Sequence, residues 1–123
     1  MSLVAIFCGD REWTDAAKIK AKLIELDPCL VIEGEAPGAD KLSRELCEAM
    51  GIKFEPFPAA WAIYGRAAGP LRNKVMLDRL LWYREQGYEV AVIAFHSNLN
   101  ESKGTKNMVN MAKAFEIIPE VIK

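Results

Sequence analysis

Short apolar runs alternate with amphipathic segments along the chain, and this alternation limits the fold more than any other feature. Continuous apolar runs, as in strands covered on both faces, occupy residues 3–8, 30–32 and 90–95, and a further strand is predicted at residues 52–57. Apolar residues with helical spacing lie between and after them, over residues 16–26, 42–50, 76–82 and 105–115, with Phe115 facing inward. Strands separated by helices predict a parallel sheet covered on both faces.

The right-handed connection rule leaves few topologies for such a chain. We predict an α/β fold: a Rossmann-like, doubly wound, mostly parallel sheet of about five strands in the order 3-2-1-4-5. The last strand is predicted at Ile117–Ile118. A length of 123 residues suits one domain over residues 1–123. Ligands of such sheets bind beyond the carboxyl ends of the strands, where the strand order reverses.

Residues 58–70 fit neither a strand nor a regular helix. They hold two glycines and two prolines, without clean periodicity and without the polarity of a solvated loop. A long irregular connection in a compact domain is usually functional, so we expect this segment to border a site. Arg72 and Asn73 follow Pro70, which suits the first turn of the next helix.

Glycine-bearing loops follow the first, second and fourth predicted strands as well as the third. They include Gly9-Asp10-Arg11, Gly34 to Asp40, and Gly104-Thr105. Glycine allows close approach of backbone to a ligand, and helix starts offer free N–H groups to anions. Neither a G-x-x-x-x-G-K-[ST] loop nor a G-x-G-x-x-G fingerprint is present. Four such loops at one edge predict a phosphate site, although each glycine alone fits an ordinary turn.

Several side chains admit two interpretations. A cation early in a helix is unfavourable unless an anion partners it, so Arg72 indicates a phosphate or carboxylate partner, a solvated arginine, or an arginine paired with Asp40 or Asp78. Trp13 and Trp61 could stack on a base or cover the core. Asp40 could cap a helix or bind a ribose hydroxyl.

The composition restricts partners and compartment. Sixteen basic against seventeen acidic side chains give a net charge of −1, which argues against nucleic acid as a partner. Three cysteines without a C-x-x-C pair and a single histidine suit free thiols and no metal site. The apolar start lacks a basic segment before it, and no apolar run is long enough to suggest a membrane span. We therefore expect a cytoplasmic protein without a membrane partner.

The loops together resemble the YspA-like branch of the SLOG superfamily. Residues 9–15, G-D-R-E-W-T-D, are similar to its G-S-R-x-W-T-D opening, and residues 34–40 to its G-x-A-x-G-A-D. Residues 61–76 are similar to its W-x-x-x-G-x-x-A-G-P-x-R-N-x-x-M signature, and Gly104-Thr105 to its closing helix start. The resemblance covers nearly the whole chain in the right order. It implies a Rossmann-like domain for nucleotides or ADP-ribose-like ligands.

The same resemblance relates the chain to LOG-type phosphoribohydrolases and DprA-type DNA-processing proteins. LOG enzymes carry an R-K-x-x-M element with a catalytic arginine, which Arg72 and Met76 match with Asn73 in place of the lysine. Met108 stands where those enzymes have the glutamate that assists N-glycosidic cleavage. Asp10 replaces the usual serine, which implies a phosphate nearer Gly104-Thr105.

We predict binding or sensing of a nucleotide-derived, phosphate-bearing molecule related to AMP, ADP-ribose or NAD, with no further cofactor required. The alternatives are an N-glycosidase acting on nucleoside phosphates, with Arg72, Asp40 and Glu33 as candidate catalytic residues, and a DNA-processing accessory protein. A homo-oligomer is left open, with Trp82 or Tyr83 as candidate contacts. The predicted ligand-binding residues are Gly9, Asp10, Arg11, Trp13, Gly34, Gly38, Ala39, Asp40, Trp61, Gly65, Gly69, Arg72, Asn73, Gly104 and Thr105.

Overall fold

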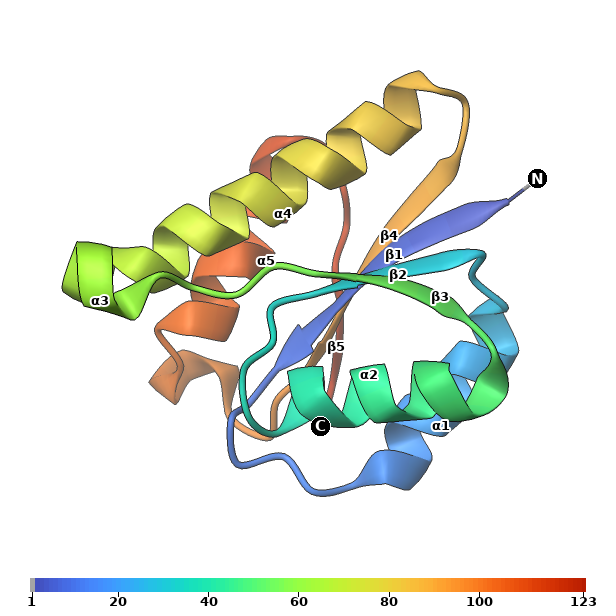
Figure 1. Ribbon diagram of the computed structural model, residues 1–123, viewed down its shortest axis with the longest axis horizontal. Coiled ribbons are helices and arrows are strands. Elements are labelled where there is room, and N and C mark those ends of the chain that lie inside the picture. Colours follow the sequence, from blue (N-terminus) through green and yellow to red (C-terminus); the bar gives the residue numbers. More distant parts are fainter. Residues whose placement is uncertain (1) are drawn as a thin grey trace.

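A single five-stranded sheet forms the centre of the molecule (Figure 1). The computed structural model describes residues 2–123. The strands run in the order β3-β2-β1-β4-β5 and every pairing is parallel, so the predicted sheet type and strand order are confirmed. Their bounds are β1 (Leu3–Gly9), β2 (Leu30–Glu33), β3 (Lys53–Pro56), β4 (Glu89–Phe95) and β5 (Glu120–Ile122).

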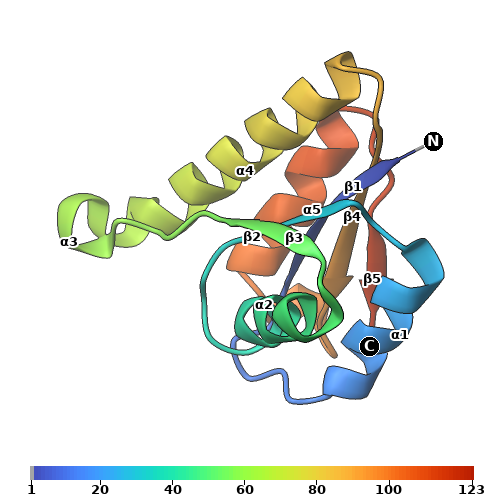
Figure 2. The ribbon, with the colours of Figure 1, turned by 45° about the vertical axis from the view of Figure 1, so that its right-hand side comes forward.

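Two helices cover each face of this sheet (Figures 1 and 2). The helices α1 (Ala16–Leu26) and α2 (Ala39–Met50) lie on one face. The helices α4 (Ala68–Glu85) and α5 (Gly104–Ala114) lie on the other. A helix pair on each face explains why the inner strands are apolar at consecutive positions rather than at alternate ones.

Alternate side chains of β1 belong to the two halves of the core. Val4 and Ile6 pack in the cluster beneath α4 and α5, whereas Ala5 and Phe7 pack in the cluster beneath α1 and α2. All four are fully buried. The central pair, β1 and β4, is in register from Leu3–Glu89 to Gly9–Phe95, so both strands end together at one edge.

The prediction of an irregular segment at residues 58–70 was wrong for most of its length. The segment contains the short helix α3 (Trp61–Tyr64), the 3₁₀ turn η1 (Gly65–Ala67) and the start of α4 at Ala68. Pro70 is compatible with this start because the N–H groups of a first helical turn have no partner within the helix. Arg72 is consequently the fifth residue of α4 and lies just beyond its first turn.

The last strand also differs from the prediction. It occupies Glu120–Ile122 and pairs with the end of β4, whereas Ile117 is buried in the core beside α5 and Ile118 is 93% exposed. A left-handed turn at Glu116 (φ 63°) ends the helical course and places the two isoleucines in the connection. Phe115, predicted to face inward, caps the end of α5 and is 40% exposed.

Candidate functional site

A cavity of about 530 Å³ opens where β1 and β4 end. Its walls come from the end of β1, His96 directly after β4, the residues that lead into α2, the segment from α3 into α4, and the segment that leads into α5. This is the edge at which doubly wound sheets bind ligands, and the volume suits a small molecule.

Ten of the fifteen predicted ligand-binding residues line this cavity, and five do not. Those that line it are Gly9, Asp10, Arg11, Asp40, Trp61, Gly69, Arg72, Asn73, Gly104 and Thr105. Those that do not are Trp13, Gly34, Gly38, Ala39 and Gly65. The candidate catalytic residue Glu33 also lies outside the wall.

The surroundings of these five residues show what each of them does instead of lining the cavity. The Trp13 ring packs on Phe95 in the core (centroids 5.7 Å apart), so it covers the core and offers no face to a base in the cavity. Ala39, the first residue of α2, is fully buried in the core between this helix and the sheet. Gly65 lies in η1 with open space where a side chain would be. Gly34 and Gly38 shape the loop before α2 without lining the cavity.

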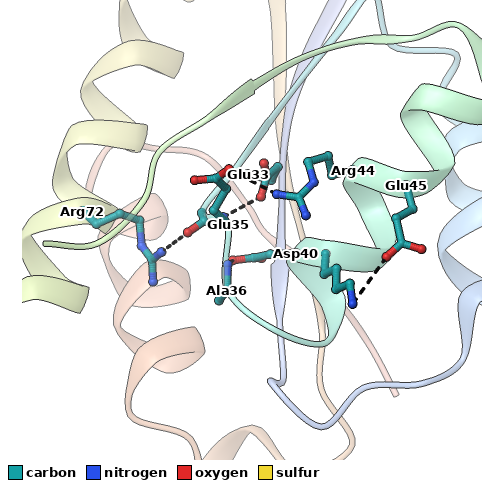
Figure 3. A network of polar contacts seen from close by, with 9 residues as sticks. Glu33, Glu35, Ala36, Asp40, Arg44, Glu45 and Arg72 are labelled. Carbon is teal, nitrogen blue, oxygen red and sulfur yellow. Dashed lines mark hydrogen bonds and ion pairs between the residues drawn. The ribbon is translucent and has the colours of Figure 1, made fainter. Parts of the chain in front are cut away.

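Arg72 reaches from α4 to the loop after β2 (Figure 3). Its Nη1 donates to the carbonyl oxygen of Gly34, and its Nε donates to Asn73 Oδ1 at 3.1 Å. Within residues 2–123, Nη2 and the second hydrogen of Nη1 have no acceptor. The guanidinium is therefore held in place with donors to spare at the cavity, the arrangement that suits an anion.

The absence of a side chain at Gly34 makes room for this guanidinium. A Cβ atom at Gly34 would lie 2.8 Å from Arg72 Cζ and 2.8 Å from Asp40 Oδ2. Any larger residue would therefore displace Arg72, Asp40 or the loop. Gly34 therefore acts by positioning Arg72 and does not itself line the cavity.

Asn73 ties the beginnings of two helices together. Its Nδ2 donates to the Gly104 carbonyl at 3.1 Å and to Asn107 Oδ1 at 3.0 Å, while its Oδ1 receives the Arg72 Nε–H. Asn73 is 4% exposed, so these bonds are shielded from water. One side chain thus fixes the Arg72 guanidinium and the start of α5 relative to each other.

Asp40 lies beside Arg72 and is 4% exposed. Its Oδ2 accepts from the Ala36 N–H at 3.2 Å, whereas Oδ1 has no partner within residues 2–123. Burial raises the pKa of the Asp40 carboxyl from 3.8 to about 6, and the Arg72 charge opposes this rise. A buried carboxylate oxygen without a partner is costly to the protein alone, so a hydroxyl or a proton from outside would stabilise it.

Glu33, at the end of β2, is fully buried on the α2 side of the sheet. Its Oε2 accepts from the Glu35 N–H, and its Oε1 has no partner in the described residues. Burial raises the pKa of the Glu33 carboxyl from 4.5 to about 7. Glu33 therefore lies outside the cavity wall, at the end of β2. Its carboxyl can titrate there without contacting a bound substrate.

The Glu33→Gln variant should be more stable than the wild type above pH 7 and less sensitive to pH. Between pH 4.5 and 7 the unfolded carboxyl ionises while the folded one keeps its proton, so wild-type stability falls as pH rises through this window. One pKa unit corresponds to about 1.4 kcal/mol, so the whole effect on the free energy of unfolding is at most about 3.5 kcal/mol. Melting temperatures measured across the window check this. Equal slopes against pH for both proteins would contradict it.

The start of α5 adds amide donors to the cavity. Ser102 Oγ accepts from the Thr105 N–H at 3.0 Å, and Asn107 N–H donates to the Lys103 carbonyl. In the same first turn, the Gly104 and Lys106 N–H groups have no acceptor within residues 2–123. Free N–H groups and the helix dipole favour an anion at this end of α5.

Trp61 forms an aromatic wall of the cavity. Its ring is 49% exposed and packs against Gly69, where a Cβ atom would lie 3.3 Å from the ring. The absence of a side chain at position 69 thus leaves room for the indole against the beginning of α4. A half-exposed indole beside a cavity can stack on a planar group.

Charges of both signs line the cavity in equal number, and sequence reasoning missed several of them. The basic residues are Arg11, Arg66, Arg72 and Lys103, and the acidic ones are Asp10, Glu12, Asp40 and Glu101. Arg66, Lys103, Glu12 and Glu101 were not predicted, although each adjoins a predicted loop motif. His96 also lines the wall, with Nε2 3.9 Å from Asp10 Oδ2. Four basic against four acidic residues suit a compact anion better than an extended polyanion.

Comparison with known proteins adds no family assignment: no family model and no curated protein matches the chain. Within residues 2–123, no helix is both long and apolar enough to cross a bilayer. The same part of the chain holds no group of three or more histidine, cysteine, aspartate or glutamate residues placed to bind a metal.

Proposed function

We propose that the cavity binds a phosphate-bearing, nucleotide-derived small molecule. The observation that carries this proposal is Arg72: its guanidinium is fixed by Gly34 and Asn73 and keeps unused donors at the cavity. A phosphate can use these free donors through the planar guanidinium, which forms charge-assisted and bidentate hydrogen bonds with such groups.

The other walls support the remaining parts of such a ligand. The amides at the start of α5 can receive a second anionic oxygen, and Trp61 offers a face to a base. Asp40, with one unpaired oxygen, can accept a hydrogen bond from a sugar hydroxyl. This division assigns the phosphate to Arg72 and α5, the sugar to Asp40 and the base to Trp61.

Calorimetric titration tests the proposal with AMP, ADP-ribose, NAD and the phosphate-free adenosine. We expect binding by at least one phosphate-bearing probe and markedly weaker binding by adenosine. If none of the phosphate-bearing probes gives heat at protein concentrations suited to micromolar affinity, the proposal is wrong.

The Asp40→Asn variant should bind a simple anion more tightly than the wild type above pH 6. Sulfate keeps a constant charge in this range, so only the protein titrates. Ionised Asp40 repels an anion at Arg72, and loss of that charge should strengthen sulfate binding on the order of ten-fold. Wild-type affinity should rise as pH falls through about 6, and the variant should lose that part of the rise. Chemical-shift titration measures both. Identical pH profiles would contradict the expectation.

A second candidate is hydrolysis of an N-glycosidic bond, favoured by Asp40. Its carboxyl lies at the cavity beside Arg72 with a pKa of about 6, so it can hold or accept a proton near neutral pH. Met108, which also lines the cavity, is 1% exposed and offers no carboxylate. Chromatography of nucleoside phosphates incubated with the protein tests this. A released base that disappears with Asp40→Asn would support hydrolysis, and unchanged substrates across a broad panel would exclude it.

A further inference from the structure

Exposed apolar side chains gather on α3 and on the outward face of α4. Six of the ten large hydrophobic residues that are exposed lie on these two helices: Trp61, Ile63, Tyr64, Leu71, Val75 and Trp82. The segment that carries α3 and the beginning of α4 projects from the rest of the molecule (Figures 1 and 2). Clustered apolar residues of this kind mark an interaction surface.

The helix α4 is apolar on two opposite sides. Met76, Leu77 and Leu80 are buried against the sheet. On the far side, Leu71, Val75, Asp78 and Trp82 follow one another at spacings of four, three and four residues and are all exposed. We call these four residues the α4 stripe. A helix needs one apolar face to pack on its own sheet, and this spacing is that of a seam between two helices.

The spacings between successive residues of the α4 stripe are four, three and four, and this order is the same from either end of the helix. Two copies of the stripe that run in opposite directions therefore match position for position. We propose that α4 pairs antiparallel with α4 of a second copy of this chain. A two-fold axis between positions 75 and 78 would place Leu71 against the partner's Trp82, and Val75 against the partner's Asp78. Two-fold dimers use one patch on both copies in this way.

Charges beside the stripe complement each other in this arrangement. Asp78 is the one charged member of the stripe, and within a chain it pairs with Lys74 at 2.7 Å. Both side chains are more than half exposed, so they are free to rearrange. In the antiparallel pair, Lys74 of each copy lies next to the partner's Asp78. Each acidic group in the seam thereby meets a lysine from both chains.

Trp82 is exposed and lies against a guanidinium that is fixed in place. The Arg79 guanidinium lies 4.6 Å from the centre of the Trp82 ring, and Glu55 fixes that guanidinium with hydrogen bonds of 3.0 and 3.1 Å. Tyr83 Oη donates to the same carboxylate at 2.7 Å. A large, 46% exposed ring with a fixed neighbour loses little entropy on association, as is typical of residues that dominate interfaces.

Sedimentation equilibrium over a concentration series tests the pairing. The wild type should form dimers, and Val75→Asp should raise the dimer dissociation constant by about 100-fold or more because it places a second acidic group in the seam. Ile118→Asp is the matched control, since Ile118 is 93% exposed but lies outside the stripe. It should leave the dimer unchanged. A wild type that stays monomeric throughout, or a Val75→Asp variant that dimerises as well as the wild type, would overturn the proposal.

A charge exchange between chains tests the antiparallel register. Lys74→Glu and Asp78→Lys should each prevent self-association, because like charges then face each other across the seam. Mixed together, the two variants should form a heterodimer in which each Glu or Asp faces a lysine. Each variant lacks the ion pair between positions 74 and 78 of its own chain, and mixing does not restore it. Only contacts between chains can therefore restore association. A mixture that associates no better than its components would overturn the register and with it the proposal. None of these results depends on what the cavity binds.

Discussion

Arg72→Ala should weaken binding of whichever phosphate-bearing probe the protein prefers by about ten-fold or more. Each charge-assisted hydrogen bond from the guanidinium contributes about 1.5–3 kcal/mol, and the variant loses those that the free donors would make. Arg72→Lys keeps the charge but loses the planar fork, so its affinity should lie between that of the alanine variant and the wild type. Titration calorimetry with the three proteins measures this order.

Arg72 also has a structural role that the experiment must separate from binding. Its Nη1 bond to the Gly34 carbonyl joins α4 to the loop before α2. Thermal unfolding of each variant shows whether the fold survives. Arg84→Ala is the matched control, because Arg84 lies on the same helix and contacts the Phe115 carbonyl far from the cavity. Equal affinity for Arg72→Ala and the wild type would remove the observation on which the proposed function depends.

The sheet could be predicted from the sequence because it depends on local patterns. Continuous apolar runs such as residues 3–8 occur where a strand is covered on both faces, and the handedness of the connections then fixes the order. The end of the chain shows where this reasoning fails. Ile117 and Ile118 look like a strand, yet the strand forms at Glu120–Ile122, because register with β4 is a property of the sheet and not of the segment.

The site was predictable as a set of loops and not as a set of contacts. The ends of parallel strands must meet, so Gly9, Asp40 and Gly104 could be placed at one edge in advance. Whether a loop residue turns toward the cavity or the core depends on packing, which the sequence does not state. Trp13 and Trp61 lie in similar glycine-containing contexts, but Trp13 packs on Phe95 while Trp61 stays half exposed.

Gly38→Ala should destabilise the fold more than Gly65→Ala, because the methyl group added at Gly38 meets both an unfavourable backbone conformation and close backbone neighbours. Gly38 precedes α2 with φ 74° and ψ −124°, a conformation that side chains disfavour by about 1–3 kcal/mol. A Cβ atom there would also lie under 3.0 Å from the carbonyl oxygens of Asp10 and Arg11. The Asp10 carbonyl accepts from the N–H groups of Trp13 and Ala39, so it cannot withdraw without breaking the contact between the first loop and α2. Crowding of this kind adds about 1–3 kcal/mol.

Gly65→Ala supplies the matched comparison, because Gly65 has φ 54° and ψ −129° but nothing within 4 Å of the added methyl group. Gly65→Ala should therefore lose stability only through its unfavourable backbone conformation, without crowding. Gly38→Ala should melt lower still, by roughly 4 °C for each additional kcal/mol in a domain of this size. It should also lose affinity for phosphate-bearing probes, since Asp40 and Arg72 are positioned from the same loop. Equal melting temperatures for the two alanine variants would contradict this prediction. They would mean that the loop at Gly38 shifts to accommodate the methyl group, and that the close contact between Asp10 and the start of α2 is not needed for stability.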